Sequence, residues 1–349
     1  MAADIGIGTQ PAVIAPGARA LAPARPGRGG VQHLPNEAVF SLTELPKRLG
    51  VIGAGPIGCE LAQSFAHFGS EVFLVESTHG IMPREDPEAS NVVRESMIRD
   101  GVNLLCCGRD TKVESRDDGI HLTLDSHGKH YDEQVDQLLV AVGRAPNVTR
   151  IGLETVGIDF DPRVGVTVDD KLQTTNPNVF AAGDVCSQYK FTHAADFMAR
   201  IVIQNALFPF KAKASKLIVP WATYTSPEIA HVGLYEKEAQ ERGIEIDTYV
   251  QRFEHVDRAI LEGDDEGFVK VHTKKGKDKI LGATIVATNA GDLISEVKLA
   301  MKAGVGLGTI GGTIHPYPTQ AEAIRKLGDQ FSRTRLTPGK AKFLKFLMG

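Results

Sequence analysis

The sequence predicts an α/β fold with Rossmann-like parallel strands, followed by a C-terminal α+β domain. The chain has 36 glycines but only 6% aromatic residues, a composition typical of α/β sheets with tight turns near ligands. Residues 49–76 have the pattern of a complete strand–turn–helix–strand unit. After residue 217, strand-like segments follow one another as in an antiparallel sheet. A length of 349 residues suits two or three domains.

Composition and charge exclude several classes of protein. With 42% hydrophobic and 23% charged residues, the chain is neither disordered, collagen-like nor a coiled coil. A net charge of −4 argues against a nucleic-acid-binding surface. The sequence has no run of about 18 apolar residues, so we expect no membrane partner. Its 4 cysteines lack a CxxC or zinc spacing, which favours a reducing, cytoplasmic setting.

The N-terminal part predicts little regular structure. Residues 11–17 are an apolar segment that we expect to form a short buried strand ending in a turn. Residues 18–38 are rich in Pro, Gly and Arg and are typical of a connector. The arginines and the single acid before residue 37 also resemble a transit peptide, but the prolines there would break its amphipathic helix.

Residues 49–76 show the clearest secondary-structure pattern in the chain. Residues 49–52 form an apolar strand, residues 53–58 a glycine turn, and residues 56–68 a helix with one apolar face. Gly69 ends the helix, and residues 71–76 form a second buried strand. We expect a further helix over 86–100 and strands over 102–105, 111–114, 120–124 and 137–142.

Two glycine-punctuated segments lead to the C-terminal half. They are VAVGRAPN at 140–147 and TTNPNVFAAGDV at 174–185, and a helix over 193–207 follows the second. The antiparallel strands are predicted within 223–234, 246–253, 267–273 and 279–287, with helices over 236–242, 290–303 and 319–327.

The glycine turn fits the pattern G-x-G-x-x-G between a strand and a helix. Gly53 permits the tight turn, Gly55 lets the backbone approach a diphosphate, and Gly58 allows close helix–strand packing. The amides of residues 53–58, including Ile57, then face the phosphates at the positive end of the helix. Pro56 is tolerated there because its missing N–H would have no helical partner.

Glu76 closes the second strand, 18 positions after Gly58. A carboxylate at this distance accepts hydrogen bonds from the adenosine ribose and repels a 2′-phosphate. The motif therefore predicts a site for NAD, with NADP less favoured. The alternative is a turn that only packs the unit, with Glu76 as a solvated strand end.

With this unit, GRAPN at 143–147 and TNPNVFAAGDV at 175–185, the chain resembles the pyridine nucleotide–disulfide oxidoreductase family, class I. The resemblance implies Rossmann-like FAD- and NAD(P)-binding domains plus a C-terminal α+β dimerisation domain. It divides the chain into an FAD-domain remnant with linker (1–39), an NAD(P)-binding domain (40–144), the rest of the FAD-binding domain (145–215) and a dimerisation domain (216–349). It also implies hydride transfer from NADH to FAD and on to an acceptor at a homodimer interface.

The resemblance assigns further cofactor-binding residues. Gly143 lies in the GRxPN motif, and Asp184 matches the acid that binds the flavin ribityl chain. His193 and Ala194 match the start of a helix directed at the flavin, and Glu60 matches a glutamate near the nicotinamide. From the residues alone, Asp184 could instead be a helix N-cap, Glu60 an ordinary surface charge, and His193 a packing or capping residue.

The segment His315-Pro316-Tyr317-Pro318-Thr319-Gln320-Ala321-Glu322 is similar to the family's H-P-T-x-x-E. Aligning P-T-x-x-E puts Tyr317 at the position of the histidine of the family's thiol reductases, and tyrosine there resembles mercuric reductases. The chain as a whole is similar to both mercuric reductases and dihydrolipoamide dehydrogenases. The resemblance thus implies Tyr317, Glu322 and His315 as catalytic residues. A phenol with a pKa of about 10 is a poor base at neutral pH, which disfavours the proton transfer that accompanies oxidation of a dithiol to a disulfide. Alternatively, the segment is a rigid turn before a helix capped by Thr319 and Glu322.

Two family features have no counterpart in this sequence. No earlier strand–turn–helix carries G-x-G-x-x-G, because Gly6-Ile7-Gly8 lacks the third glycine, and no C-x-x-x-x-C occurs. We expect Cys59, Cys106, Cys107 and Cys186 to be small buried hydrophobes and assign no metal site. Soft-metal binding by the adjacent Cys106 and Cys107 is the alternative.

These features leave three hypotheses. The first is a mercuric-reductase-like oxidoreductase using FAD and NADH, with a small molecule or metal ion as electron acceptor. The second is a non-catalytic or truncated NADH-binding, dimerising module that cannot hold FAD. The third is a cysteine-independent NADH oxidase, which would still need FAD.

Overall fold

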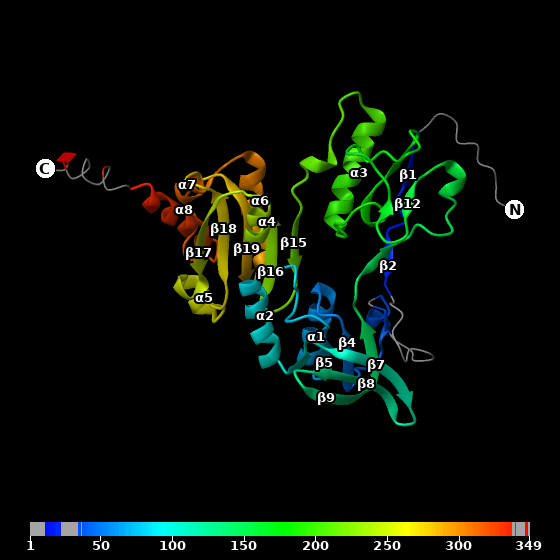
Figure 1. Ribbon diagram of the computed structural model, residues 1–349. Coiled ribbons are helices and arrows are strands. Elements are labelled where there is room, and N and C mark those ends of the chain that lie inside the picture. The colour runs from blue at the N-terminus through cyan, green and yellow to red at the C-terminus, as the bar shows by residue number, and fades with distance from the viewer. Residues whose placement is uncertain (1–10, 22–33, 36, 337–338, 340–345, 348–349) are drawn as a thin grey trace. The chain divides into compact units, whose positions relative to one another are not determined.

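The structure is a computed structural model that describes residues 11–21, 34–35, 37–336, 339 and 346–347 (Figure 1). It divides into two compact units. Unit 1 comprises Met1–Pro23 and Val142–Val219, and unit 2 comprises Ala24–Ala141 and Pro220–Gly349. The Gly6-Ile7-Gly8 segment and most of the predicted connector over 18–38 lie outside the described residues.

Unit 1 is built from short strand pairs around one helix. Strand β1 (Ala12–Ile14) pairs in parallel with β14 (Val179–Ala181), which confirms the strand predicted within 11–17. Its predicted burial is wrong, because Val13 is 53% exposed. The start of the predicted connector is wrong, because β2 (Ala18–Ala20) pairs antiparallel with β11 (Arg144–Pro146). The other elements are β12 (Phe160–Asp161), β13 (Gly165–Val166), α3 (Thr192–Leu207) and the short 3-10 helices η2 (Glu154–Val156), η3 (Gly183–Val185) and η4 (Ala214–Lys216).

Unit 2 begins with a parallel five-stranded sheet in the order β3-β10-β4-β5-β6. Its strands are β3 (Leu34–Pro35), β4 (Arg48–Ile52), β5 (Glu71–Val75), β6 (Val102–Leu105) and β10 (Gln137–Val140). The connecting helices are α1 (Pro56–His67) and α2 (Pro87–Arg99), and the 3-10 helix η1 (Val39–Ser41) precedes β4. The predicted strand–turn–helix–strand unit is confirmed, with helix and strand ends within one or two residues of those expected.

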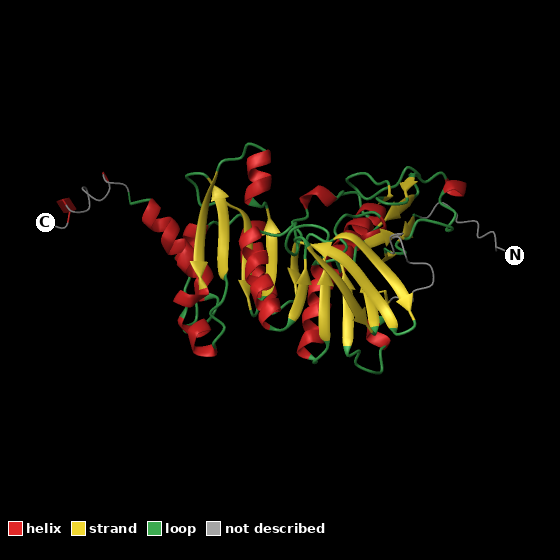
Figure 2. Cartoon of the chain, turned by 60° about the horizontal axis from the view of Figure 1, so that its bottom comes forward, coloured by secondary structure: helices red, strands yellow, loops and turns green. Residues whose placement is uncertain are grey.

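Between β6 and β10 of the parallel sheet, the chain forms a separate three-stranded antiparallel sheet (strands are yellow in Figure 2). It consists of β7 (Arg109–Arg116), β8 (Gly119–Ser126) and β9 (Lys129–Val135). His127 and Gly128 join β8 to β9 with φ of 50° and 77°, the left-handed geometry of a two-residue type I′ hairpin. The strands predicted over 111–114 and 120–124 were too short, and β9 was missed.

The C-terminal part is an antiparallel five-stranded sheet in the order β15-β16-β19-β18-β17. The strands are β15 (Pro220–Thr223), β16 (Glu228–Gly233), β17 (Ile246–Arg252), β18 (Phe268–Lys274) and β19 (Ile280–Ala287). With them occur the helices α4 (Glu236–Glu241), α5 (Asp257–Glu262), α6 (Ala290–Ala303), α7 (Leu307–Gly311) and α8 (Glu322–Thr334), and the 3-10 helix η5 (Phe253–His255). Among the described residues, no helix combines the length and apolar character needed to cross a bilayer.

Two sequence predictions fail in this part. Helices α5 and α7 were not predicted, because each is too short to repeat an apolar period. Helix α8 begins at Glu322 with Ala321 as N-cap and no side-chain cap. The capping box of Thr319 and Glu322 is therefore wrong, since the Thr319 hydroxyl donates to the carbonyl of Pro316 instead.

The two sheets of unit 2 share one hydrophobic core. Residues of α1, α2 and the parallel sheet cluster with Ile229, Phe268 and Val286 of the antiparallel sheet. A buried ion pair also joins them, because the Lys270 ammonium lies 2.8 Å from the Asp86 carboxylate and each side chain is 10% exposed. Asp86 is in addition the N-cap of α2 and accepts from the amides of Glu88 and Ala89. One carboxylate thus starts a helix and neutralises a buried cation.

We expect Asp86→Ala to lower the free energy of unfolding by about 2–4 kcal/mol, because it removes the cap and leaves Lys270 with only Glu88 as its acidic partner. Urea unfolding followed by circular dichroism measures the change. Glu245→Ala, which breaks the exposed pair with Lys275, is the matched control and should be near neutral. Equal stability of both variants would contradict this role of Asp86.

Candidate functional site

The glycine turn has the geometry that its sequence predicts. Gly53 has a φ of +102°, and its amide donates to the carbonyl of Val75 at 2.8 Å. A Cβ at Gly58 would lie 1.8 Å from the carbonyl oxygen of Gly53, so only glycine allows α1 to approach the end of β4 so closely. These contacts fix the start of α1 directly after the strand.

Gly55 is the N-cap of α1, and no side chain caps the helix. Pro56 occupies its first turn, as expected. A Cβ at Gly55 would meet no atom within 4 Å, so the space in front of the turn is open. Uncapped amides, a positive helix end and open space next to a glycine are what a dinucleotide diphosphate requires. The turn therefore fits the nucleotide predicted for it, with Ile57 and Gly58 continuing the first turn of the helix.

Glu76 directly follows β5, and its carboxylate accepts a hydrogen bond from the glycine turn. One carboxylate oxygen accepts from the amide of Ala54 at 3.0 Å, and the other accepts from the amide of Thr78 and the hydroxyl of Ser77, each at 3.0 Å. Burial alone would raise the pKa of Glu76, but these hydrogen bonds outweigh it and lower the pKa. Glu76 is thus an anion at neutral pH, and the alternative of a freely solvated strand end is wrong.

Glu60 projects from α1 and is only partly exposed. Its carboxylate accepts from the amide of Tyr224 at 2.8 Å. Burial raises the pKa of Glu60, and this hydrogen bond opposes the rise without cancelling it. An ordinary surface charge is therefore the wrong description of Glu60. The sequence offered no signal for its bond to a segment 164 residues away.

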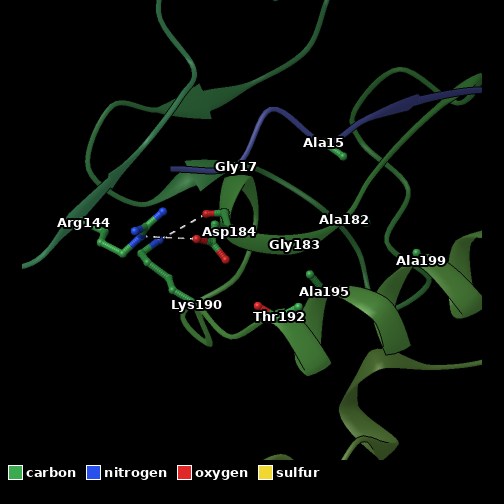
Figure 3. A pocket seen from close by; sticks show the side chains of 10 residues that line it. All are labelled: Ala15, Gly17, Arg144, Ala182, Gly183, Asp184, Lys190, Thr192, Ala195 and Ala199. Carbon is green, nitrogen blue, oxygen red and sulfur yellow. Dashed lines mark hydrogen bonds and ion pairs between the residues drawn. The ribbon is translucent and has the colours of Figure 1, made fainter. Parts of the chain in front are cut away.

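Unit 1 contains a separate cavity of about 440 Å³ (Figure 3). It lies among Ala15, Gly17, Arg144, Ala182, Gly183, Asp184, Lys190, Thr192, Ala195 and Ala199. These residues come from the segment after β1, from β11, from the AAGD turn and from the start of α3. Two motifs that are far apart in the sequence, GRAPN and AAGD, thus meet at one cavity.

Charged groups gather at one side of this cavity. The Arg144 guanidinium lies 3.5 Å from the Asp184 carboxylate, and the Lys190 ammonium donates to the carbonyl of Asp184 at 3.1 Å (Figure 3). Gly143, with a φ of +120°, precedes Arg144 and accepts from the amide of Leu21. The ion pair runs through Arg144 Nε, which is buried and makes no hydrogen bond. This incompletely satisfied donor fits an additional oxygen ligand in the cavity.

Asp184 lies within η3 and caps no helix, since the N-cap there is Ala182 without a side-chain hydrogen bond. The alternative of an N-capping Asp184 is therefore wrong. At the start of α3, Thr192 and Ala195 line the cavity. His193 and Ala194 do not: His193 stacks on Phe191 at 5.4 Å, and Ala194 is buried. The helix start reaches the cavity as expected, but through neighbouring side chains. The cavity fits part of a flavin nucleotide, with a carboxylate for hydroxyl groups and two cations for phosphate.

The three residues assigned to the C-terminal site have different partners. Tyr317 is 69% exposed, and its hydroxyl donates to Asp257 at 2.7 Å, which raises the pKa of the phenol. Glu322 pairs with Arg325 at 3.4 Å and with Lys326 at 3.7 Å.

His315, whose side chain is 9% exposed, lies 2.8 Å from the Glu296 carboxylate. Glu296 is the acid that sequence reasoning missed, because it belongs to α6 and lies outside the motif. It also lines a second cavity, of about 550 Å³, together with Arg258, Asp292 and Thr319.

The cysteines only partly follow the prediction. Cys59 is fully buried, and burial raises its pKa, as expected of a small hydrophobe. Burial also raises the pKa of Cys186, to about 11, although its residue is partly exposed. Cys106 and Cys107 are partly exposed, so the expectation that all four cysteines are buried is wrong.

Comparisons with solved structures agree with this architecture. The HOCl-induced flavoprotein disulfide reductase RclA from Escherichia coli superposes with a TM-score of 0.83 and 28% identity, over 91% of this chain and 73% of that one. LpdA from Mycobacterium tuberculosis gives a TM-score of 0.82 and 26% identity, over 91% and 69%.

Curated relatives match most of this chain but not most of their own. The mercuric reductases of Bacillus cereus and Staphylococcus aureus are 36% and 35% identical over 313 residues, 90% of this chain and 50% and 57% of theirs. A dihydrolipoyl dehydrogenase of S. aureus is 33% identical over 86% of this chain and 64% of its own. The chain thus spans about half to two thirds of the length of these relatives.

Family models match both parts of the chain. Residues 6–199 match the pyridine nucleotide-disulphide oxidoreductase family, and residues 219–327 match the dimerisation domain of that family. The glycine turn, the AAGD cavity and the C-terminal antiparallel sheet all fall within these ranges. The chain belongs to the pyridine nucleotide-disulphide oxidoreductase family.

Proposed function

We propose that the chain binds NADH and acts in a flavin-dependent oxidoreductase resembling mercuric reductase. The observation that carries the proposal is the glycine turn, where Gly55 faces open space and a Cβ at Gly58 would lie only 1.8 Å from the carbonyl oxygen of Gly53. Within residues 53–58, the amides of Gly55, Ile57 and Gly58 would hold the diphosphate, because those of Gly53 and Ala54 already bind Val75 and Glu76. Glu60 would lie toward the nicotinamide end. The family match and the mercuric reductase relatives support the same class of reaction.

The preference for NADH over NADPH rests on Glu76. Its lowered pKa keeps the carboxylate charged at neutral pH, so it would accept from ribose hydroxyls and repel a 2′-phosphate. The carboxylate already accepts from the amides of Ala54 and Thr78 and from the amide and hydroxyl of Ser77. Because a carboxylate has about four acceptor positions, a ribose hydroxyl would replace the hydroxyl of Ser77.

The cavity of unit 1 would hold the flavin nucleotide. Asp184 would accept from a ribityl hydroxyl, Arg144 and Lys190 would neutralise phosphate charge, and Gly143 would position Arg144. The amino end of α3, from Thr192 through His193 and Ala194, would add its positive dipole. When bound, the flavin supplies the chemistry of accepting a hydride and passing on electrons.

The C-terminal part would provide the dimer interface and the residues that contact the electron acceptor. The dimerisation-domain match over 219–327 supports self-association. Tyr317, held by Asp257, stays a protonated phenol because its pKa is raised, so it would contact the acceptor rather than abstract a proton. Glu322 would hold the surrounding cations, and His315, held at 2.8 Å from the Glu296 carboxylate, would be the third catalytic residue. The acceptor would be a small molecule or a metal ion.

A second function is favoured by one sequence observation. The chain contains no C-x-x-x-x-C pair, so no redox disulfide of that spacing can form within it. On this reading the chain is a non-catalytic module that binds NADH and dimerises without FAD. Flavin binding separates the two functions.

We expect the purified chain to bind added FAD saturably, with quenching of flavin fluorescence, and NADH to bleach the bound flavin. Asp184→Ala should weaken FAD binding, because it removes the carboxylate beside the cavity. Asp170→Ala is the control, since Asp170 binds Ser215 and does not line the cavity. NADH binding without any FAD binding would establish the second function, and binding of neither nucleotide would contradict both.

Exchanging the charge at residue 76 should change nucleotide selectivity. Glu76→Arg should move the ratio of NADPH to NADH affinity by about tenfold or more toward NADPH, because a repulsive anion becomes a phosphate partner. Isothermal titration of both nucleotides gives the ratio, which general destabilisation does not alter. Glu71→Arg makes the same charge change at the other end of β5 and should leave the ratio unchanged. An unaltered ratio in Glu76→Arg would refute the ribose assignment.

Two glycine variants separate binding from folding. Gly55→Ala should weaken NADH binding but leave unfolding nearly unchanged, because its φ of −77° and open surroundings accept a methyl group. Gly58→Ala should lower the free energy of unfolding by about 1–3 kcal/mol through its clash with Gly53. Urea unfolding and NADH titration measure both effects. Undiminished NADH affinity in Gly55→Ala would exclude the diphosphate from this turn.

A further inference from the structure

We propose that His79, Cys106 and Cys107 form a binding site for one thiophilic metal ion of the Zn²⁺ type, distinct from the nucleotide and flavin sites. One ring nitrogen and two sulfur atoms of these residues all lie within 4.8 Å of one another. The sequence prediction assigned no metal site and left soft-metal binding by Cys106 and Cys107 as the alternative. The inference takes up that alternative and adds His79 as a ligand.

Backbone hydrogen bonds bring the three residues together from two loops. His79 follows β5, and the two cysteines follow β6, the next strand of the parallel sheet. The amide of Cys107 donates to the carbonyl of Thr78 at 2.9 Å, and the amide of Gly108 donates to the carbonyl of Glu76 at 2.9 Å. The two loops are therefore fixed to each other on the side of the sheet where both strands end.

A third segment closes the site. The hydroxyl of Ser126 donates to the carbonyl of Cys106, which ties the β8–β9 turn to the cysteine pair. This places His127 Nε2 3.4 Å from Cys106 Sγ. His127 is thus a neighbour of Cys106 and lies outside the group of three ligand atoms. Cys107 has a φ of 57°, in the left-handed region.

The distances suit metal coordination. With bonds of about 2.3 Å to sulfur and about 2.0–2.1 Å to nitrogen, two ligands at a tetrahedral angle lie roughly 3.6 Å apart. Among the three ligands, Cys107 Sγ lies 3.5 Å from His79 Nδ1, and no two ligand atoms are more than 4.8 Å apart. A shift of roughly 1 Å in the widest pair would bring all three to coordination distance of one ion.

The donor set selects the kind of ion. Thiolate and imidazole favour Zn²⁺ and softer ions such as Cu⁺ over Mg²⁺ or Ca²⁺, which require oxygen ligands. Binding forms two metal–sulfur bonds and one metal–nitrogen bond, and each thiol releases its proton to solvent. No oxidation or reduction is involved. Because all three residues are at least partly exposed, an ion can reach them directly.

Cobalt titration tests the site in the reduced, tag-free full chain. Co²⁺ should bind with one equivalent and give the near-ultraviolet thiolate-to-cobalt charge-transfer band, and Zn²⁺ but not excess Mg²⁺ should abolish that band. Cys106→Ser and Cys107→Ser should lose the band, and His79→Ala should weaken Co²⁺ binding. Cys186→Ser, at a partly exposed cysteine of unit 1, is the matched control and should keep it.

A second measurement needs no variant. Zn²⁺ should slow alkylation of Cys106 and Cys107 in the unaltered chain but not that of Cys186, as mapped by mass spectrometry. Absence of the charge-transfer band in folded, reduced protein would overturn the proposal. So would a band that survives both cysteine substitutions, or Zn²⁺ protection that does not reach Cys106 and Cys107. None of these outcomes depends on NADH or FAD binding.

Discussion

The parallel order of β3-β10-β4-β5-β6 is the constraint on which the functional surfaces of unit 2 depend. Parallel strands end at the same edge of a sheet, so whatever follows each strand gathers there. The glycine turn follows β4, Glu76 and His79 follow β5, and the cysteine pair follows β6. The proposed nucleotide site and the proposed metal site of unit 2 both lie at this edge for that reason.

Hydrogen bonds from main-chain amides then make this edge a connected structure. Glu76 accepts from Ala54 in the glycine turn, and its own carbonyl accepts from Gly108 beyond the cysteines. The residue that would bind the ribose therefore also fixes the loop that presents the thiols, through its backbone carbonyl and not through its carboxylate. The carboxylate joins the glycine turn to the segment after β5, and these hydrogen bonds lower its pKa.

The sequence was most informative where structure is local. Pro56, Gly58 and Glu76 act within one strand–turn–helix–strand unit, and their spacing alone predicted the turn. Strand β9 was missed because KHYDEQV has no run of apolar residues, and its pairing to β8 decides its conformation. The same argument explains α5 and α7, which are too short to show a helical period.

Partners at long range could not be predicted from one sequence. Nothing near Glu60 indicates Tyr224, and nothing near His315 indicates Glu296, because tertiary packing alone brings these pairs together. The cysteine pair is a further case. Its histidine neighbours come from a turn 28 residues earlier and a hairpin 21 residues later, and no fixed spacing encodes them.

The joint between the two sheets of unit 2 restricts how such chains can be recombined. Gln63 of α1 exchanges two hydrogen bonds of 2.8 Å with the backbone of Ser226, and Glu85 accepts from Trp221 and Tyr235. Helix α1, which begins at the glycine turn, is therefore hydrogen-bonded through its middle to the C-terminal part of unit 2. In a chimera, residues 216–349 would be replaced by those of a relative. The glycine turn would keep its conformation only if the relative supplied groups that form the same hydrogen bonds with Gln63 and Glu85.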